Sequence, residues 1–198
     1  MRLPLQALAL ALVTGCGSTE AVPQGPLVNG GMWTALAGST CNAQERNVTV
    51  QASPHVDPSG GAIAYATNPP ASGPHYPFWA RWGSWPNVPR GNWVHNLEHG
   101  GVALLARCPT GTCDDVRAEL TRAVASFTAD PTCAPSPALP VAVRVVITND
   151  PAVTTAVAGA AWGWLYSADC VEPATLRAFY ARHARGAPED FCADGSFP

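Results

Sequence analysis

Prolines interrupt the chain repeatedly between Pro54 and Glu98, and this stretch constrains the fold more than any other. Seven further prolines follow Pro54, at positions 58, 69, 70, 74, 77, 86 and 89. Proline fixes φ, lacks a backbone N–H and restricts the residue before it, so regular structure is repeatedly broken here. A segment of this length without regular structure is unusual inside a domain and is commonly functional. We therefore expect a long irregular loop carried by a scaffold built from the rest of the chain.

The flanking segments predict that scaffold. Apolar patterning indicates strands over residues 47–53, 100–107, 140–148 and 157–166, and helices over 114–127 and 173–185. This order predicts an α+β fold: a small, mostly antiparallel sheet with two helices on one face and a long irregular loop rich in tryptophan and histidine. Apolar residues make up 47% of the 198 residues, enough for one core, so we expect a single globular domain over residues 39–198.

The N-terminus has the features of an export signal. Arg2 precedes roughly a dozen mostly apolar residues, a run that is too short to span a bilayer. We interpret residues 1–15 as a signal peptide. The sequence VTGC resembles a bacterial lipobox, which implies lipidation of Cys16, and Gly17 after it favours the outer membrane if the organism has one. An ordinary secretory signal is the alternative. Residues 16–38 are expected to form the lipidated N-terminus and a flexible tether.

Six cysteines remain after Cys16, an even number that indicates up to three disulfides in an exported chain. They are Cys41, Cys108, Cys113, Cys133, Cys170 and Cys192. Six cysteines allow fifteen pairings, and only a local bridge between Cys108 and Cys113, around the turn PTGT, is suggested by position. The absence of any CxxC pair argues against a zinc cluster.

The charge pattern gives no reason to expect nucleic acid as a partner. The net charge is −3, the chain contains no lysine, and its arginines are scattered. A nucleic-acid-binding surface would need a basic face. The expected contacts are therefore the membrane, through the lipid anchor only, and an envelope protein or glycan.

Histidines concentrate in the irregular loop. His75, His95 and His99 lie there in a chain with only five histidines, and His55 begins the same stretch. Neutral imidazoles suit Zn²⁺ or Cu²⁺, so we predict a copper or zinc site formed by His75, His95 and His99 with His55. Glu98 could bind the ion directly or hold a histidine's second nitrogen from the outer shell, where we place it together with Asn96. For each histidine alone, a hydrogen bond to a nearby carbonyl is the plainer explanation.

The same residues form an H-x-x-E-H pattern, which in inverted zinc peptidases lies on a helix and uses the glutamate as a base. Here Pro89 and Gly91 precede the pattern and Gly100 follows it, so we expect at most a single helical turn. His183 is expected to be structural instead, packed beneath Phe179 on the apolar face of the last helix.

Aromatic residues fill the same loop. Trp79 and Trp82, with Tyr76, are expected to form the wall of a pocket, while the other tryptophans cover the core. Trp162 and Trp164 lie two apart on a predicted strand and are expected in the core.

The motifs NPPASGPHYPFWARWG, VHNLEHGGVALL, AAWGW and RHARGAPE resemble a bacterial family of exported and membrane-anchored proteins, domain of unknown function 3105. The resemblance spans residues 55–189 and implies a single unit with its site at His75, His95, Asn96, Glu98 and His99. The family pattern P-P-T/S-S-G-P-H is altered only at Ala71. The resemblance implies no activity.

Three functions fit these residues. The first is a lipid-anchored protein of the cell envelope that binds copper or zinc; the single methionine outside the signal, Met32, counts against Cu⁺, which prefers sulfur ligands. The second is a non-catalytic envelope module that binds a protein or glycan through the tryptophan-rich loop. The third is a metal-dependent hydrolase or oxidoreductase with Glu98 as base. The sequence leaves open whether the protein is an enzyme, and it identifies no catalytic residue.

Overall fold

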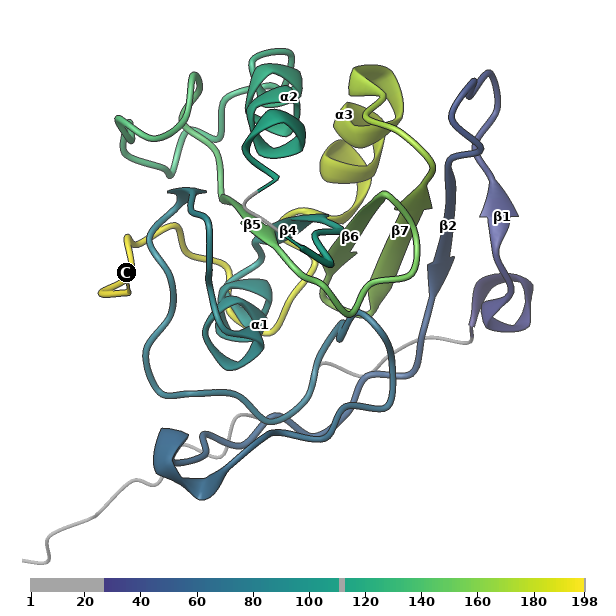
Figure 1. Cartoon of the computed structure of the whole chain (residues 1–198). Helices are drawn as coiled ribbons and strands as arrows, with labels where there is room; N and C mark the ends of the chain where they lie inside the picture. Colours follow the sequence, from purple (N-terminus) through teal and green to yellow (C-terminus); the bar gives the residue numbers. More distant parts are fainter. Residues whose placement is uncertain (1–26, 111–112, 198) are drawn as a thin grey trace, which may run out of the picture.

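A seven-stranded mixed sheet forms the centre of the computed structural model, which describes residues 27–110 and 113–197 (Figure 1). The strands lie in the order β1 (Thr34–Ala35), β2 (Gln44–Asn47), β7 (Trp164–Ala168), β6 (Val157–Ala161), β4 (Val102–Ala106), β5 (Val145–Asn149) and β3 (Gly83–Ser84). Neighbours are antiparallel from β1 to β4, whereas β5 is parallel to both β4 and β3. The predicted α+β class with a mostly antiparallel sheet is confirmed.

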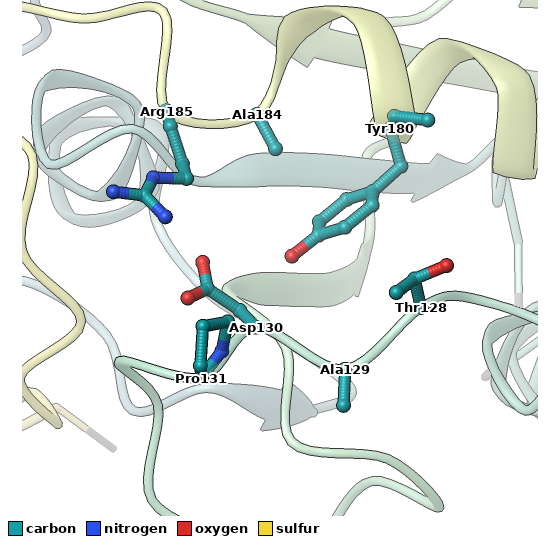
Figure 2. Close-up of a pocket in the computed structure, with 8 residues that line it drawn as sticks. Thr128, Ala129, Asp130, Pro131, Tyr180, Ala184 and Arg185 are labelled. Atoms are coloured by element: carbon teal, nitrogen blue, oxygen red, sulfur yellow. The ribbon is translucent and has the colours of Figure 1, made fainter.

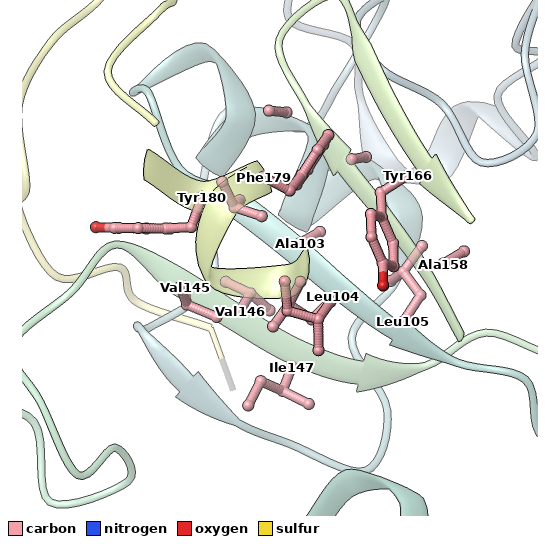
Figure 3. Close-up of a cluster of buried hydrophobic side chains, with 14 of the residues drawn as sticks. Ala103, Leu104, Leu105, Val145, Val146, Ile147, Ala158, Tyr166, Phe179 and Tyr180 are labelled. Atoms are coloured by element: carbon pink, nitrogen blue, oxygen red, sulfur yellow. The ribbon is translucent and has the colours of Figure 1, made fainter. Parts of the chain in front are cut away.

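The middle of the sheet is apolar on both faces. Every residue of β4 and β6 is buried, as expected for strands covered on both sides. Leu104 and Ile147 pack with Tyr166 and Phe179 between the sheet and the last helix, and all four are fully buried (Figure 3). Burying such a side chain stabilises the fold by about 1.5–3 kcal/mol relative to leaving it exposed.

Three helices cover the sheet among the described residues. The helices α2 (Asp114–Val124) and α3 (Pro173–His183) lie on one face, as predicted, and contact each other. The helix α1 (Arg90–Glu98) lies on the opposite face, against β4 (Figure 1). The expectation of helices on one face only is therefore incomplete.

The direction of the chain explains the two faces. The chain crosses from β3 over β5 to β4 through α1, and then returns from β4 to β5 through α2. Connections between parallel strands are almost always right-handed. Two right-handed crossings in opposite directions place their helices on opposite faces of the sheet.

The nine-residue helix α1 corrects the prediction of at most a single turn. Pro89 stands at the N-cap, where its missing N–H costs no helical hydrogen bond. At the other end Gly100 adopts φ 78°, its N–H bonds to the Leu97 carbonyl, and the Gly101 N–H bonds to the Asn96 carbonyl. This is the Schellman arrangement that ends helices. The glycines that argued against a helix are thus its stop signal.

Three strand predictions were also wrong in their bounds. The strand expected over residues 140–148 begins only at Val145, as β5. The strand expected over residues 47–53 lies earlier, as β2, and ends at Asn47. The single strand expected over 157–166 is two strands, β6 and β7, joined at Trp162 and Gly163, where Gly163 has φ 72°. Trp162 is buried at this turn, and Trp164 on β7 is half-buried.

Three disulfides link the domain, as the even cysteine count predicted. They join Cys41 to Cys170, Cys108 to Cys113, and Cys133 to Cys192. Disulfides persist in oxidising compartments, so they indicate an extracellular or periplasmic location.

The predicted signal peptide and Cys16 lie outside the described residues. Of the expected tether, the structure describes residues 27–38, which carry a 3₁₀ turn (Val28–Gly31) and β1, and β1 pairs with β2. Among the described helices, none combines the length and the apolar character that a membrane crossing requires.

Candidate metal centre

The candidate centre lies where α1 meets two segments of the proline-rich loop. The loop segments run side by side, because the Val56 N–H donates to the His75 carbonyl and the His75 N–H donates to the Pro54 carbonyl. The helix is tied to the loop by Asn96, whose side chain bonds both the N–H and the carbonyl of Ala80. Asn96, expected in an outer shell, is therefore seen to clamp the loop backbone onto α1.

Four side chains converge at this point. Donor atoms of His55, His75, His95 and Glu98 all lie within 4.8 Å of one another. The three imidazole rings have centroids 4.6–5.0 Å apart. Three of the four side chains are buried and His55 is exposed. The structure thus brings together three of the four histidines predicted as ligands, and places Glu98 among them, as in the direct-binding alternative.

Backbone carbonyls fix the proton positions on two of the rings. Nδ1 of His75 lies 3.0 Å from the Gly73 carbonyl oxygen, and Nδ1 of His95 lies 2.6 Å from the Tyr76 carbonyl oxygen. A carbonyl only accepts, so in the neutral rings Nδ1 carries the proton and Nε2 keeps a free lone pair. Metal-binding histidines are commonly oriented in this way.

Glu98 completes the group with a negative charge. One carboxylate oxygen accepts a hydrogen bond from the Ser53 hydroxyl at 2.7 Å, and the other lies 3.0 Å from Nε2 of His75. Nε2 of His75 nevertheless makes no well-directed hydrogen bond. Burial raises the pKa of Glu98, but His75, when Nε2 of that ring also carries a proton, and the Ser53 hydroxyl outweigh burial and hold the pKa below the ordinary value. The site therefore favours an ionised carboxylate among imidazoles.

His99 lies beside this group and not within it. Its ring contacts those of His95, Trp79 and Phe191, with centroids 4.6, 4.4 and 4.0 Å away. Its Nε2 lies 3.1 Å from Glu189, while its buried Nδ1 has no hydrogen-bond partner. Sequence reasoning missed Glu189 and Ser53; only the RHARGAPE motif, which ends at Glu189, pointed to the former.

Burial sets the charge of the two helix histidines. Burial first, with a smaller contribution from neighbouring imidazoles, lowers the pKa of His95 to about 4 and that of His99 to about 3. Both rings are thus neutral at neutral pH. A neutral imidazole is the form that binds a metal ion.

The aromatic residues predicted as a pocket wall lie in different places. Trp79 is half-buried and its ring centroid lies 5.1 Å from that of His95, so it does border the centre. Trp82 is buried, and its indole N–H bonds the Ala193 carbonyl. Tyr76 lines a separate cavity of about 190 Å³ with Tyr65 and Arg90. Only Trp79 of the three contacts the histidine rings.

His183 has the structural position that was predicted for it. Its ring stacks on Trp164, with centroids 4.1 Å apart, and packs against Phe179 at 4.8 Å. Its Nε2 lies 3.2 Å from Glu45, which also binds Arg182. This histidine takes no part in the centre.

A second cavity, of about 220 Å³, lies near the end of α3. Figure 2 shows the Asp130 carboxylate, the Arg185 guanidinium and the Tyr180 hydroxyl facing it. The buried Arg144 neutralises Asp130 at 2.8 Å and also binds the His99 carbonyl at 2.9 Å. These contacts anchor the end of α1, and the polar groups of the cavity already have partners.

The fold and the site together define a disulfide-linked α+β domain with a candidate metal centre of three histidines and one glutamate. The chain belongs to the family described as Protein of unknown function (DUF3105), which matches residues 55–194. No curated protein matches the chain, and no solved structure does.

Proposed function

We propose that the protein is an exported metal-binding protein that holds Zn²⁺ or Cu²⁺ at His55, His75, His95 and Glu98. The observation that carries the proposal is the convergence of four donor atoms within 4.8 Å. The rings of His75 and His95 are already oriented by carbonyls that accept at Nδ1, which leaves Nε2 available to an ion. Imidazole and carboxylate ligands with metal–ligand distances near 2 Å are typical of such ions.

Four protein donors favour holding an ion over chemistry on it. Catalytic zinc sites usually keep three protein ligands and one open position, while closed sites have four. Here Glu98 is one of the four converging side chains, which removes the residue that a hydrolase would use as its base. Binding, delivery or sensing of the ion is therefore the favoured role.

The tryptophan-rich loop supports a binding module less well. Trp82 and Trp93 are buried, so they contribute to the core and not to a ligand surface. The imidazoles of His55, His75 and His95 have centroids no more than 5.0 Å apart, which is close enough for joint coordination of one ion. An envelope protein or glycan partner remains a part of the proposal only as the recipient or source of the ion.

The proposed location is the cell envelope, with the lipid on Cys16 as the membrane attachment, on the periplasmic or surface side of an outer membrane where one exists. Its support is the lipobox-like VTGC and Gly17 in the sequence. The disulfides agree with an oxidising compartment.

Calorimetric titration of the purified protein with Zn²⁺ and Cu²⁺ tests the function. We expect one ion per chain with a dissociation constant of about 1 μM or tighter. His95→Ala should abolish this binding, while His183→Ala, which removes a histidine far from the centre, should preserve it. Binding no tighter than millimolar in the unaltered protein would contradict the proposal.

A further inference from the structure

The carboxylates of the centre differ from the other paired carboxylates of the domain. Among the described residues, every other ion-paired carboxylate contacts an arginine; these are Glu45, Asp114, Glu119, Asp130, Asp150 and Asp190. The ion-pair partners of Glu98 and Glu189 among the described residues are histidines, not arginines. Their negative charges therefore have no permanent cation beside them.

The pair of Glu45 and His183 provides an internal comparison. Its nitrogen–oxygen distance of 3.2 Å is close to the 3.1 Å between His99 and Glu189. Glu45, however, also binds Arg182, so its charge is neutralised within the protein. In this fold, the charge of a glutamate that only orients a histidine can thus be neutralised by an arginine. The charge of Glu189 is not neutralised in this way.

Glu189 is held firmly at the edge of the centre. Its N–H donates to the Glu98 carbonyl at 3.0 Å, and its side chain reaches His99. The neighbouring Phe191 packs on His99, and Cys192 is bound to Cys133. Burial and the nearby Glu98 raise the pKa of Glu189 above its ordinary value. Glu189 is therefore kept beside Glu98 and His99 at the edge of the centre.

The donor set points to the same class of ion. Soft monovalent ions such as Cu⁺ favour sulfur ligands. All six cysteines of the described residues are in disulfides, and Met32 is exposed in the N-terminal part of the domain, so neither supplies sulfur to the centre. Nitrogen and oxygen donors with two negative charges match one divalent ion.

We propose that Glu189, positioned by His99, supplies the second negative charge of the centre and makes it select a divalent over a monovalent cation. The inference rests on the proposed function, because it concerns the same ion. It assigns Glu189 as a specificity-determining residue that need not touch the ion. Coulomb energy is proportional to the charge of the ion. Loss of this carboxylate therefore costs a divalent ion twice the binding free energy that it costs a monovalent ion. The affinity for the divalent ion then falls by the square of the factor for the monovalent ion.

The test measures the affinities of Zn²⁺ and Ag⁺, a redox-stable monovalent probe, in the unaltered protein and in Glu189→Gln. Glutamine keeps the acceptor for His99 and removes only the charge. Outer-shell changes commonly cost 10–100-fold in metal affinity. If Zn²⁺ binding falls by about 100-fold, Ag⁺ binding should fall by about 10-fold, and the Zn²⁺/Ag⁺ ratio by about 10-fold.

Two further variants make the result decisive. Glu45→Gln removes the compensated glutamate of the comparison pair and should leave the Zn²⁺/Ag⁺ ratio unchanged. Glu189→Asp keeps the charge and should restore most of the ratio. Equal losses for both ions in Glu189→Gln, or no loss, would overturn the role of Glu189 even if zinc binds. A protein that binds neither ion would instead refute the proposed function itself.

Discussion

At the scale of single residues, His55 differs from the other donors of the centre in its exposure. His75, Glu98 and His95 have 0%, 2% and 3% of their surface exposed, whereas His55 lies at the surface. Three donors are thus fixed in the interior and the fourth faces solvent. An ion would enter and leave past His55, because the other sides of the centre are covered by α1 and the loop.

We predict that His55→Ala weakens Zn²⁺ binding without abolishing it. All three buried donors remain, whereas His95→Ala removes one of them, so the loss should be only about 10–100-fold, comparable with that of an outer-shell change. Release should become faster, and transfer of zinc to a chromogenic chelator in a stopped-flow experiment measures it. An affinity equal to that of the unaltered protein would show that His55 is no ligand.

The residues of the site were only partly predictable. The clustering of His55, His75 and His95 in one irregular stretch was sufficient to predict their convergence. The separate positions of Glu98 and His99 were not, because successive helical residues point about 100° apart and the helix itself was not expected. Glu189 comes from the C-terminal segment, and no spacing rule links it to His99.

At the scale of elements, the end of α1 determines where the donors point. The Schellman turn at Gly100 directs the chain at once into β4. A Cβ at Gly101 would meet the Trp82 ring of the loop and the backbone carbonyl of Asn96, the residue whose side chain clamps the loop to the helix. A side chain at this position would separate the helix from the loop that carries His75.

We therefore predict that Gly101→Ala destabilises the fold by about 1–3 kcal/mol, the usual effect of overpacking. The added Cβ would lie 2.6 Å from the Trp82 ring and 2.7 Å from the Asn96 carbonyl oxygen. Urea unfolding measures the change in the free energy of unfolding. Gly60→Ala is the matched control, since a Cβ there meets nothing within 4 Å, and its effect should stay within about 0.5 kcal/mol. Equal effects of the two changes would contradict the packing argument.

The elements with clear periodicity were predicted well, and those set by tertiary contacts were not. The apolar run of β4 and the apolar face of α3 were correctly predicted from the sequence. The helix α1 has almost entirely buried residues and no amphipathic pattern, so periodicity did not reveal it. The division of residues 157–168 into a hairpin depends on Gly163, a single residue inside an apolar run.

At the scale of the whole molecule, arginine–carboxylate contacts join distant parts of the chain. Arg144 on the approach to β5 binds Asp130 and Asp190, and it holds the carbonyl at the end of α1. Burial raises the pKa of Asp130, but bonds from Thr132 and Arg144 outweigh it and hold the pKa below its ordinary value. Hydrogen bonds from Arg185 and, to a lesser extent, from Arg144 lower the pKa of Asp190.

These lowered pKa values predict loss of stability in acid. A carboxyl whose pKa is lower in the folded than in the unfolded state stabilises the fold above its unfolded pKa, about 3.9 for aspartate. That contribution is lost as pH falls through the folded value. We expect the free energy of unfolding, measured with urea in excess chelator, to fall below about pH 4. Asp130→Asn should be less stable at neutral pH and show a shallower decline; an unchanged slope would contradict this origin.

The sheet topology could not be predicted from the sequence alone. Composition and element order were sufficient for the α+β class, but the parallel pairing of β3, β4 and β5 joins segments separated by irregular chain. The disulfide pairing was equally open, since only the bridge between Cys108 and Cys113 is local.

The positions of the disulfides suggest that an ion at the candidate centre would act as a cross-link. No cysteine lies between Cys41 and Cys108, so the proline-broken half of the domain has no covalent cross-link. An ion shared by His55, His75 and α1 would tie that half together, restricting the unfolded chain there as a disulfide does elsewhere. Removal of the ion by a chelator would then destabilise the proline-rich part of the domain, and reduction of the disulfides would destabilise the rest.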